Sequence, residues 1–574
     1  MRNKALTPLD RFWRLLKPDR KEIKNVYVYA VFTGLISMSL PLGISAIINL
    51  IQGGQISTSW IVLVVVVILG IAVTGILQIL QLRITENLQQ KIFARAAFDF
   101  AYRIPRIRLD ELYKQYAPEL ANRFFDILTV QKGLSKILID FSSASLQILF
   151  GLILLCLYHP FFIIFSLALI LLVFVIIKFT AQKGLDASLK ESKYKYKIAH
   201  WLEELARTNI TFKLAGNSKI PLERMDGKVG EYIKYRDVHF GVLVQQYSLM
   251  IIFKVLVATG LLAIGGVLVF EQQMNIGQFV GAEIIILIVL GSVEKLIMSL
   301  ETIYDVLTGL EKMGQLTDMG LDNPNGVSMV KNEYPAGLKV ELADVSFSYP
   351  GHYKSTLVNF NLAVESGSTV MVTGNNSSGK STMLSILSGL FHPQFGNLSF
   401  NGLPKGNIDL NELRTLIGNC ADAEQLFEGT LLENISLGRE AATFENVKWA
   451  TENVGLSDFL KKQPLGFDTE LEPEGRHLSS SIIQKIILAR SIAHKPKLLL
   501  LKDALLYLIQ SEREKIIDFL TSKEHGWTLI AVSSDIYLAK KCDKLVVISE
   551  GTVEHEGTYE QLKDLDQLKK ITHA

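Results

Sequence analysis

Hydrophobic residues in the first half of the chain gather in six long, nearly uninterrupted runs. Each run is about 20 residues or longer, which is the length that an α-helix needs to cross a hydrocarbon layer of about 30 Å. Six such runs in close succession are improbable for buried helices of a soluble protein. The pattern therefore predicts six membrane-spanning helices, at residues 26–51, 60–84, 136–157, 161–181, 247–270 and 279–298.

The polar segments between these runs predict how the helices are oriented. The short connections 52–59, 158–160 and 271–277 contain no Lys or Arg, whereas eight lie in the 25 residues before the first run. By the positive-inside rule, the N-terminus is cytoplasmic and the short connections lie outside. The long connections 85–135 and 182–246 are then cytoplasmic. Their helical periodicity predicts membrane helices that continue far into the cytosol.

The second half of the chain has a different pattern. Short β-rich runs alternate with helical patterns, which is typical of an α/β domain. Gly, Asn, Pro and Asp accumulate directly before this change, as expected for a linker. The predicted parts are a cytoplasmic N-terminal segment at 1–25, a membrane domain at 26–320, a linker at 321–336 and an α/β domain at 337–574.

Composition agrees with a very apolar half joined to an ordinary soluble half. Hydrophobic residues make up 49% of the chain, and the mean hydropathy is +0.27. The net charge of +2 argues against a nucleic-acid binder, which needs a concentrated basic surface. Cys156, Cys420 and Cys542 are too widely separated for a disulfide scaffold or a zinc site.

The α/β domain contains the pattern G-x-x-x-x-G-K-S, which is that of a phosphate-binding loop. A strand-like run at 368–373 precedes it and a helical run at 383–390 follows it, as the mechanism requires. Backbone N–H groups at the helix start cradle phosphates, Lys380 reaches the outer phosphates, and Ser381 is a candidate ligand of Mg²⁺. The predicted phosphate-binding residues are Gly374, Asn376, Ser378, Gly379, Lys380, Ser381 and Thr382.

A six-span membrane domain followed by a phosphate-loop domain resembles a half-transporter of the ATP-binding cassette (ABC) exporter type, over essentially the whole chain. The run at 301–318 resembles the type 1 secretion and peptide-exporter branch. The resemblance implies an all-α membrane domain fused to an α/β P-loop NTPase domain of the ABC type. It also implies that ATP is the ligand, that Tyr349 stacks on adenine, and that 426–438 contacts the membrane domain. Coupling helices are expected near 117–122 and 208–218.

The positions that carry hydrolysis in this family are replaced here. Asp422 stands where a glutamine senses Mg²⁺ and water, and Ser534 stands where the family has its switch histidine. The signature Leu-Ser-Gly-Gly-Gln becomes Leu478, Ser479, Ser480, Ser481 and Ile482, of which Ser479 can still bond a γ-phosphate. Lys502 replaces the carboxylate that holds Mg²⁺, and Asp503 replaces the glutamate that acts as general base. The resemblance therefore implies that ATP binds, and it leaves open whether this chain is an enzyme at all.

Lys502 allows two interpretations. Its ammonium group could offset phosphate charge in place of Mg²⁺, so that nucleotide binding depends only weakly on the metal. Alternatively, its flexible stem could carry the charge away from a site that is merely weak.

Two functions remain open. The chain could be the degenerate half of an ATP-driven exporter that pairs with an intact half-transporter, because a homodimer would lack every hydrolytic group. The substrate class implied by the branch is a peptide, protein or amphipathic molecule, with a periplasmic adaptor as a further partner in a bacterial inner membrane. Alternatively, the chain could be a catalytically silent regulatory or scaffold subunit of the bilayer.

Two ionisable residues fall inside the predicted spans, where charge is costly. Lys254 lies near the cytoplasmic end of the fifth span and can extend its ammonium group toward water. Glu283 lies deeper in the sixth span. It is a candidate for lining a polar transport pathway, and an interhelical hydrogen bond is the competing interpretation.

Overall fold

The chain forms two compact units in the computed structural model. The first unit comprises Met1–Pro105 and Tyr116–Met319, and the second comprises Arg106–Gln115 and Gly320–Ala574. The ten residues 106–115, which the sequence pattern assigned to the membrane domain, therefore group with the α/β unit. The residues that the structure describes are 6–54, 58–113, 115–322, 326–329, 334–420 and 425–565.

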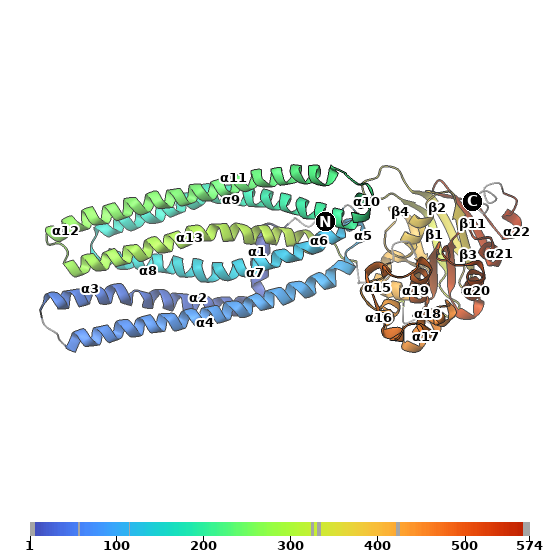
Figure 1. The fold of residues 1–574 in the computed structure, drawn as a ribbon, viewed down its shortest axis with the longest axis horizontal. Coiled ribbons are helices and arrows are strands. Elements are labelled where there is room, and N and C mark those ends of the chain that lie inside the picture. The colour runs from blue at the N-terminus through green and yellow to red at the C-terminus, as the bar shows by residue number, and fades with distance from the viewer. Residues whose placement is uncertain are drawn as a thin grey trace. The chain divides into compact units, whose positions relative to one another are not determined.

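The first unit is entirely helical over its described residues (Figure 1). Six of its helical segments are long and apolar enough to cross a membrane, and each contains one of the six predicted runs, so that prediction is confirmed. The main helices are α2 (Arg20–Ser37), α3 (Ser39–Gln52), α4 (Thr58–Arg103), α7 (Asp126–Lys136), α8 (Ser142–Tyr158), α9 (Phe161–Arg207), α11 (Ile220–Gly260), α12 (Gly266–Phe270) and α13 (Ile276–Thr317).

The first predicted span is broken near its middle. Helix α2 ends at Ser37 and α3 begins at Ser39. Pro41 explains the break, because it has no N–H to donate to the carbonyl of Ser37 four residues earlier. Two π-helical turns, Ile137–Phe141 before α8 and Leu261–Gly265 before α12, interrupt the third and fifth segments.

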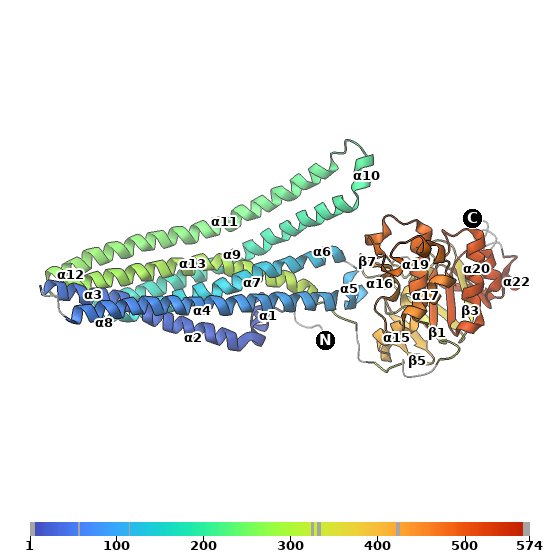
Figure 2. The ribbon, with the colours of Figure 1, turned by 60° about the horizontal axis from the view of Figure 1, so that its bottom comes forward.

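Helices α9 and α11 run side by side along their length, with the short helix α10 (Asn209–Leu214) at their far end (Figure 2). They contact α13 through close packing and through buried hydrogen bonds. Gly184 of α9 is needed for this packing, because a Cβ there would lie 2.4 Å from the ring of Tyr304. The side-chain amide of Gln246 on α11 donates to Thr180 at 2.7 Å and to the Tyr304 hydroxyl at 2.9 Å. Helices α9 (Phe161–Arg207) and α11 (Ile220–Gly260) therefore continue far beyond their apolar runs, as the periodicity predicted.

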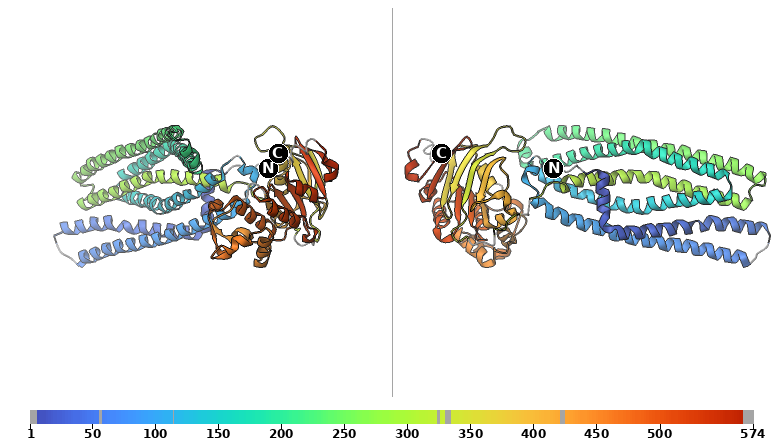
Figure 3. Two further views of the ribbon diagram at one scale, coloured as in Figure 1. Left: turned by 45° about the vertical axis from the view of Figure 1, so that its right-hand side comes forward. Right: turned by 180° about the vertical axis from the view of Figure 1, so that it is seen from behind.

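Helix α1 (Pro8–Leu16) runs across the other helices instead of along them (dark blue in Figure 3). Arg11 on one face forms ion pairs with Glu311 and Asp318 near the end of α13. The opposite face leaves Leu9 and Trp13 exposed. Such an amphipathic helix is typical of a membrane interface.

The second unit contains two main sheets. The larger has the order β12-β11-β3-β10-β9-β6, in which all neighbours are parallel except β12 and β11. The smaller has the order β2-β1-β4-β5. Their bounds are β1 Val340–Phe347, β2 Leu357–Val364, β3 Thr369–Gly374, β4 Phe395–Phe400, β5 Leu403–Pro404, β6 Ile417–Cys420, β9 Leu498–Lys502, β10 Thr528–Val532, β11 Lys544–Ser549 and β12 Thr552–Gly557. The expected α/β fold is confirmed.

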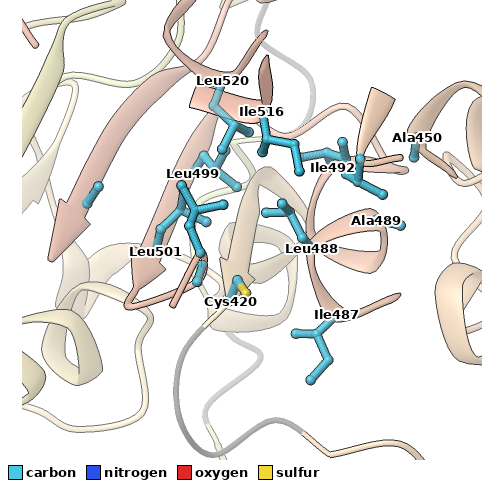
Figure 4. Close-up of a cluster of buried hydrophobic side chains, with 14 of the residues drawn as sticks. Cys420, Ala450, Ile487, Leu488, Ala489, Ile492, Leu499, Leu501, Ile516 and Leu520 are labelled. Atoms are coloured by element: carbon cyan, nitrogen blue, oxygen red, sulfur yellow. The ribbon is translucent and has the colours of Figure 1, made fainter. Parts of the chain in front are cut away.

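Helices cover both faces of the larger sheet. On one face, α19 (Ser480–Ile492) and α20 (Gln510–Thr521) pack against alternate residues of β9, including Leu499 and Leu501 (Figure 4). On the other face, α14 (Lys380–Leu387) and the smaller sheet pack against the other set of alternate residues of β9, Leu498 and Leu500. The central strands are therefore buried on both sides, as is usual for parallel sheets.

Candidate nucleotide-binding site

The phosphate-binding pattern lies between β3 and α14, at the carboxyl end of the parallel sheet. Gly374 and Gly379 adopt φ angles of +148° and +107°. A Cβ at Gly374 would lie 2.1 Å from the carbonyl oxygen of Ile548, and one at Gly379 would lie 2.7 Å from a methyl of Leu357. Only glycine fits at these two positions, so the loop wraps closely around the start of α14, where free N–H groups favour an anion.

Lys380 folds back over this loop. Its Nζ donates to the carbonyl oxygens of Gly374 at 2.7 Å and of Asn375 at 2.6 Å. Burial lowers the pKa of Lys380, the charge of Lys502 lowers it further, and the charge of Asp503 opposes the shift. The ends of β3 and β9 therefore bring these three charged groups within electrostatic range of one another.

The other predicted phosphate-binding residues differ in how exposed they are to solvent. Asn376 and Ser381 are exposed, whereas Ser378, Gly379 and Thr382 are buried. The exposed residues are therefore those whose side chains are free to meet a ligand in solvent.

Tyr349 follows β1 and is fixed against the start of α14. Its hydroxyl lies 2.9 Å from the hydroxyl of Thr382, directly after Ser381. The rings of Phe347 and Phe391 meet it nearly perpendicularly, with centroids at 5.1 and 5.4 Å. An aromatic ring held beside the phosphate loop is well placed to stack on the base of a nucleotide.

Lys502 is the last residue of β9. Side chains alternate along a strand, and Leu498 and Leu500 pack on the α14 face. Lys502 therefore points to that same face. Asp503 follows in a left-handed conformation (φ +48°), and its N–H donates to the carbonyl of Val532 at 3.0 Å. The strand thus presents the ammonium group of Lys502 on the phosphate-loop face. The chain turns at Asp503, directly after the strand, and Asp503 is exposed.

The replaced signature forms the start of α19. Ser479 is the N-cap, and its hydroxyl accepts from the N–H of Ile482. Ser480 and Ser481 take the first two helical positions without positive φ angles, so serine fits there without backbone strain. Ser479 and Ser480 are exposed, while Ile482 packs against the hydrophobic core.

A cavity of about 460 Å³ adjoins the end of β9. Its lining includes both Asp503 and Ser534, so the structure brings together the positions at which the resemblance implies a general base and a switch residue. Ser534 is exposed, and its neighbour Ser533 donates its N–H to Val372 of β3 at 3.2 Å. Asp422 lies outside the described residues.

Gln484 was missed by sequence reasoning. Its side-chain amide donates to the carbonyl of Asp503 at 2.9 Å, and its side-chain oxygen accepts from the N–H of Tyr507 at 3.1 Å. It therefore links α19 to the segment after β9. A polar residue two positions after the apolar Ile482, on a mostly buried helix, was the only available signal.

The described residues do not fit a tightly held Mg²⁺ ion. Mg²⁺ takes oxygen ligands, mainly carboxylates and substrate phosphates. Lys502 places a cation at the end of β9, and no group of three or more potential metal-binding side chains occurs within the described part of the chain. Among the predicted site residues, Ser381 and Asp503 still offer exposed side-chain oxygens.

In the helical unit, Glu283 lies half-buried on α13. Lys254, which was expected to extend its ammonium group toward water, instead donates to Glu294 of α13 at 2.6 Å and so joins α11 to α13. Glu283 and Glu294 are eleven residues apart, close to three helical turns, so both lie on one face of α13. The ion pair with Glu294 was not predicted from the sequence.

Family models match both units of the chain. The model described as ABC transporter transmembrane region matches residues 25–293, and the model described as ABC transporter matches residues 357–505. The chain carries both domains of an ABC transporter. The second model spans the phosphate loop, Lys502 and Asp503, so these residues lie in an ABC domain, which implies ATP binding.

A solved structure supports the same fold for both units. The structure of a bacterial Atm1-family ABC exporter with ATP bound matches with a TM-score of 0.82 at 19% sequence identity, over 96% of this chain and 97% of that chain. This chain therefore has the fold of an ABC exporter half-transporter, and it is a multi-pass membrane protein.

Curated relatives are similar over different lengths. ABC transporter B family member 21 of Arabidopsis thaliana is 33% identical over 39% of this chain, which spans 17% of that protein. Transport/processing ATP-binding protein ComA of Streptococcus pneumoniae is 25% identical over 77% of this chain, which spans 62% of that protein. ATP-binding cassette sub-family B member 10, mitochondrial, of Mus musculus is 25% identical over 98% of this chain and 80% of its own length.

Proposed function

We propose that this ABC half-transporter binds ATP, hydrolyses it poorly or not at all, and pairs with a catalytically intact half-transporter to drive export. One observation carries the proposal: an intact phosphate loop with Lys380 lies beside an ammonium group, Lys502, on the same face of the sheet. The loop supports phosphate binding. Lys502 opposes the binding of the metal on which hydrolysis depends.

The replacements act on one chemical step. Phosphoryl transfer needs a positioned metal, an oriented water and stabilisation of the γ-phosphate at the same moment. Groups that act as a unit are not additive, so losing one of them already removes most of the rate. Asp503 and Ser534, which line one cavity, supply neither the longer carboxylate nor the imidazole of the family.

The family resemblance supports a heterodimer. In ABC transporters each nucleotide lies between the phosphate loop of one domain and the signature of the other. A homodimer of this chain would contain two sites without Mg²⁺-holding carboxylate, general base or switch histidine. A partner that has these groups would contain one working site, completed by Ser479 of this chain.

The substrate is proposed by analogy. The resemblance of residues 301–318 to the type 1 secretion and peptide-exporter branch supports a peptide, protein or amphipathic substrate. The six apolar helices support a membrane location, and similarity to ComA of Streptococcus pneumoniae supports the cytoplasmic membrane of a bacterium. The positive-inside rule supports a cytoplasmic nucleotide-binding unit. A periplasmic adaptor is a further proposed partner.

The test uses the full chain alone in lipid nanodiscs. We expect it to bind a fluorescent ATP analogue and to release phosphate at least about 100-fold more slowly than a partner-containing complex. Lys380→Ala should abolish binding, whereas Lys448→Ala, on an exposed helix face, should not. Rapid hydrolysis by the chain alone that disappears in Lys380→Ala would overturn the proposal. ATP-independent transport by the complex would favour a silent scaffold subunit instead.

A further inference from the structure

Residues 106–115 are held against the nucleotide-binding unit at their first residues by backbone pairing. The N–H of Arg108 donates to the carbonyl of Gly320 at 3.0 Å, and the N–H of Asp322 donates to the carbonyl of Arg106 at 2.8 Å. Ile107 lies between them and is 6% exposed. This segment, in the connection between the second and third membrane spans, is therefore anchored next to the chain that leaves α13.

Side chains hold the rest of the segment. The short helix α5 (Leu109–Leu112) packs Leu109 against the hydrophobic cluster that contains Phe347 and Phe391. Tyr113 follows and places its ring on Tyr349, with centroids 5.1 Å apart and planes inclined by 19°. The ring of Phe391 meets Tyr113 at its edge, at 5.9 Å. Backbone and side-chain contacts thus fix the ring of Tyr113 in one place.

The geometry leaves no room for a base between the two tyrosines. Stacked rings lie about 3.5 Å apart, so a base inserted between two rings needs about 7 Å. The centroid separation of 5.1 Å excludes it. The other two rings around Tyr349, those of Phe347 and Phe391, meet it perpendicularly. Tyr113 is therefore the one ring among the described neighbours of Tyr349 that stacks on it as a base would.

We propose that Tyr113 competes with the nucleotide base for the stacking face of Tyr349. Binding of a purine nucleotide displaces the ring of Tyr113 and loosens the segment 106–113 from the nucleotide-binding unit. This inference rests on the proposed function, because it requires nucleotide binding at the loop that Lys380 serves. The hydroxyl contact between Tyr349 and Thr382 holds the contested ring beside that loop.

The competition couples ATP binding to the position of Tyr113, and this coupling does not require hydrolysis. The fraction of molecules in which Tyr113 has left Tyr349 sets the apparent affinity for ATP. By reciprocity, bound ATP raises that fraction. Because residues 106–113 continue directly from α4, release of Tyr113 changes the restraint at the cytoplasmic end of a membrane-spanning helix.

The test compares ATP with inorganic triphosphate, which has no base, by calorimetry on the full chain in nanodiscs. Stacking between aromatic rings corresponds to about 2- to 10-fold in a binding constant. We therefore expect Tyr113→Ala to bind ATP about 2- to 10-fold more tightly than the wild type and triphosphate equally well. Tyr113→Phe, which keeps the ring, should match the wild type. Tyr353→Ala, at a fully exposed tyrosine, is the matched control.

Hydrogen exchange supplies a second measurement that does not rely on a variant. ATP should accelerate amide exchange of residues 106–113 in the wild type, and triphosphate should not. An unchanged or weaker ATP affinity in Tyr113→Ala overturns the inference, since weaker binding would mean that Tyr113 supports the base. If the wild type binds neither ATP nor triphosphate, the proposed function fails as well. If triphosphate binds and Tyr349→Ala leaves ATP affinity unchanged, only the competition at Tyr349 fails.

Discussion

Lys380 and Lys502 place two ammonium groups at one end of the central sheet, and this pair distinguishes the site from an ordinary phosphate-binding loop. Burial lowers the pKa of Lys380, and the charge of Lys502 lowers it further. The negative charge of a polyphosphate stabilises both ammonium groups, whereas an additional Mg²⁺ ion would be repelled by the charge of Lys502. In the proposed function, Lys502 therefore favours nucleotide without bound Mg²⁺.

The first prediction concerns this metal dependence. The affinity of the wild type for a fluorescent ATP analogue should change less than about threefold when EDTA replaces Mg²⁺, because Lys502 supplies the cation. Lys502→Asp should lose at least about tenfold in EDTA, because its carboxylate would need the metal. Lys448→Asp makes the same charge change on an exposed helix and should behave as the wild type. A large loss of wild-type affinity in EDTA would show that Lys502 does not act in place of Mg²⁺.

The second prediction concerns pH. His494 is buried between Arg439 and the carbonyl of Ile417, at 2.9 and 3.2 Å. A carbonyl only accepts and a guanidinium only donates, so the ring is neutral, with hydrogen on Nε2. Burial, and then the charge of Arg439, lower the pKa of His494 to about 4. Between pH 6.5 and 4 the unfolded chain therefore binds more protons, and stability falls as pH falls.

The measurement is the thermal midpoint of the nucleotide-binding unit in the full chain, followed from pH 7 to 4.5. His494 should contribute a loss of up to about 1.4 kcal/mol per pH unit below pH 6.5. His494→Gln should flatten the profile, since Gln can still donate to the Ile417 carbonyl and never ionises. His477→Gln, at an exposed histidine, should leave the slope unchanged. Equal slopes in both variants would contradict the assignment.

At the scale of elements, glycine positions decide how closely the long helices pack. In α9, Gly184 faces the ring of Tyr304 on α13, and in α8, Gly151 faces Val289 of the same helix. Helix–helix contacts in membrane proteins depend on such small residues, because backbones must approach closely. Periodicity predicted these helices and their cytoplasmic extensions. It did not predict which of the glycines touch a neighbour.

A third prediction separates these two kinds of glycine. Gly184→Ala places a Cβ 2.4 Å from the Tyr304 ring, so α9 and α13 must shift. We expect a loss of about 1–3 kcal/mol in stability, measured as a lower midpoint of thermal unfolding in detergent. Gly75→Ala on α4 meets nothing within 4 Å and should be neutral or slightly stabilising, because alanine favours a helix. A midpoint for Gly184→Ala at or above that of Gly75→Ala would show that the contact is not restrictive.

At the scale of the whole molecule, one membrane domain and one nucleotide-binding domain lie on one chain, and in the proposed heterodimer its replaced residues divide between two sites. Ser479 caps α19 and is exposed, as a residue that completes a second chain's site must be. Lys380 serves the site in this chain's own loop. The two residues therefore belong to different sites of the proposed heterodimer.

The fourth prediction uses this separation. In a purified complex with an intact half-transporter, Ser479→Trp should reduce ATP hydrolysis at least about tenfold, because it obstructs the working site. Lys380→Ala should reduce it less, since this chain's own site contributes little turnover. Ser457→Trp, at the start of α18 (Ser457–Lys461), is the control for a bulky substitution. Phosphate release measures all three. A larger loss in Lys380→Ala than in Ser479→Trp would place the turnover in this chain's site.

The sequence by itself determined the features that depend on neighbouring residues along the chain. Six apolar runs predicted six spanning helices, and a loop between a strand-like and a helical run predicted a phosphate cradle; both depend on periodicity or spacing within about 25 residues. The break of the first span at Pro41 is also local, since proline lacks an N–H. It was missed because the length and overall hydrophobicity of the run predicted one continuous span.

Only the tertiary structure decided the contacts between residues far apart in sequence. It paired Lys254 with Glu294, linked Gln484 to Asp503, and placed Tyr113 on Tyr349. None of these pairs leaves a pattern in one sequence, because each residue fits its own helix or loop equally well without its partner. The phosphate-binding loop is determined by residues that are neighbours along the chain. The residues that contact the rest of the site from elsewhere, such as Tyr113 and Gln484, are determined by packing between distant segments.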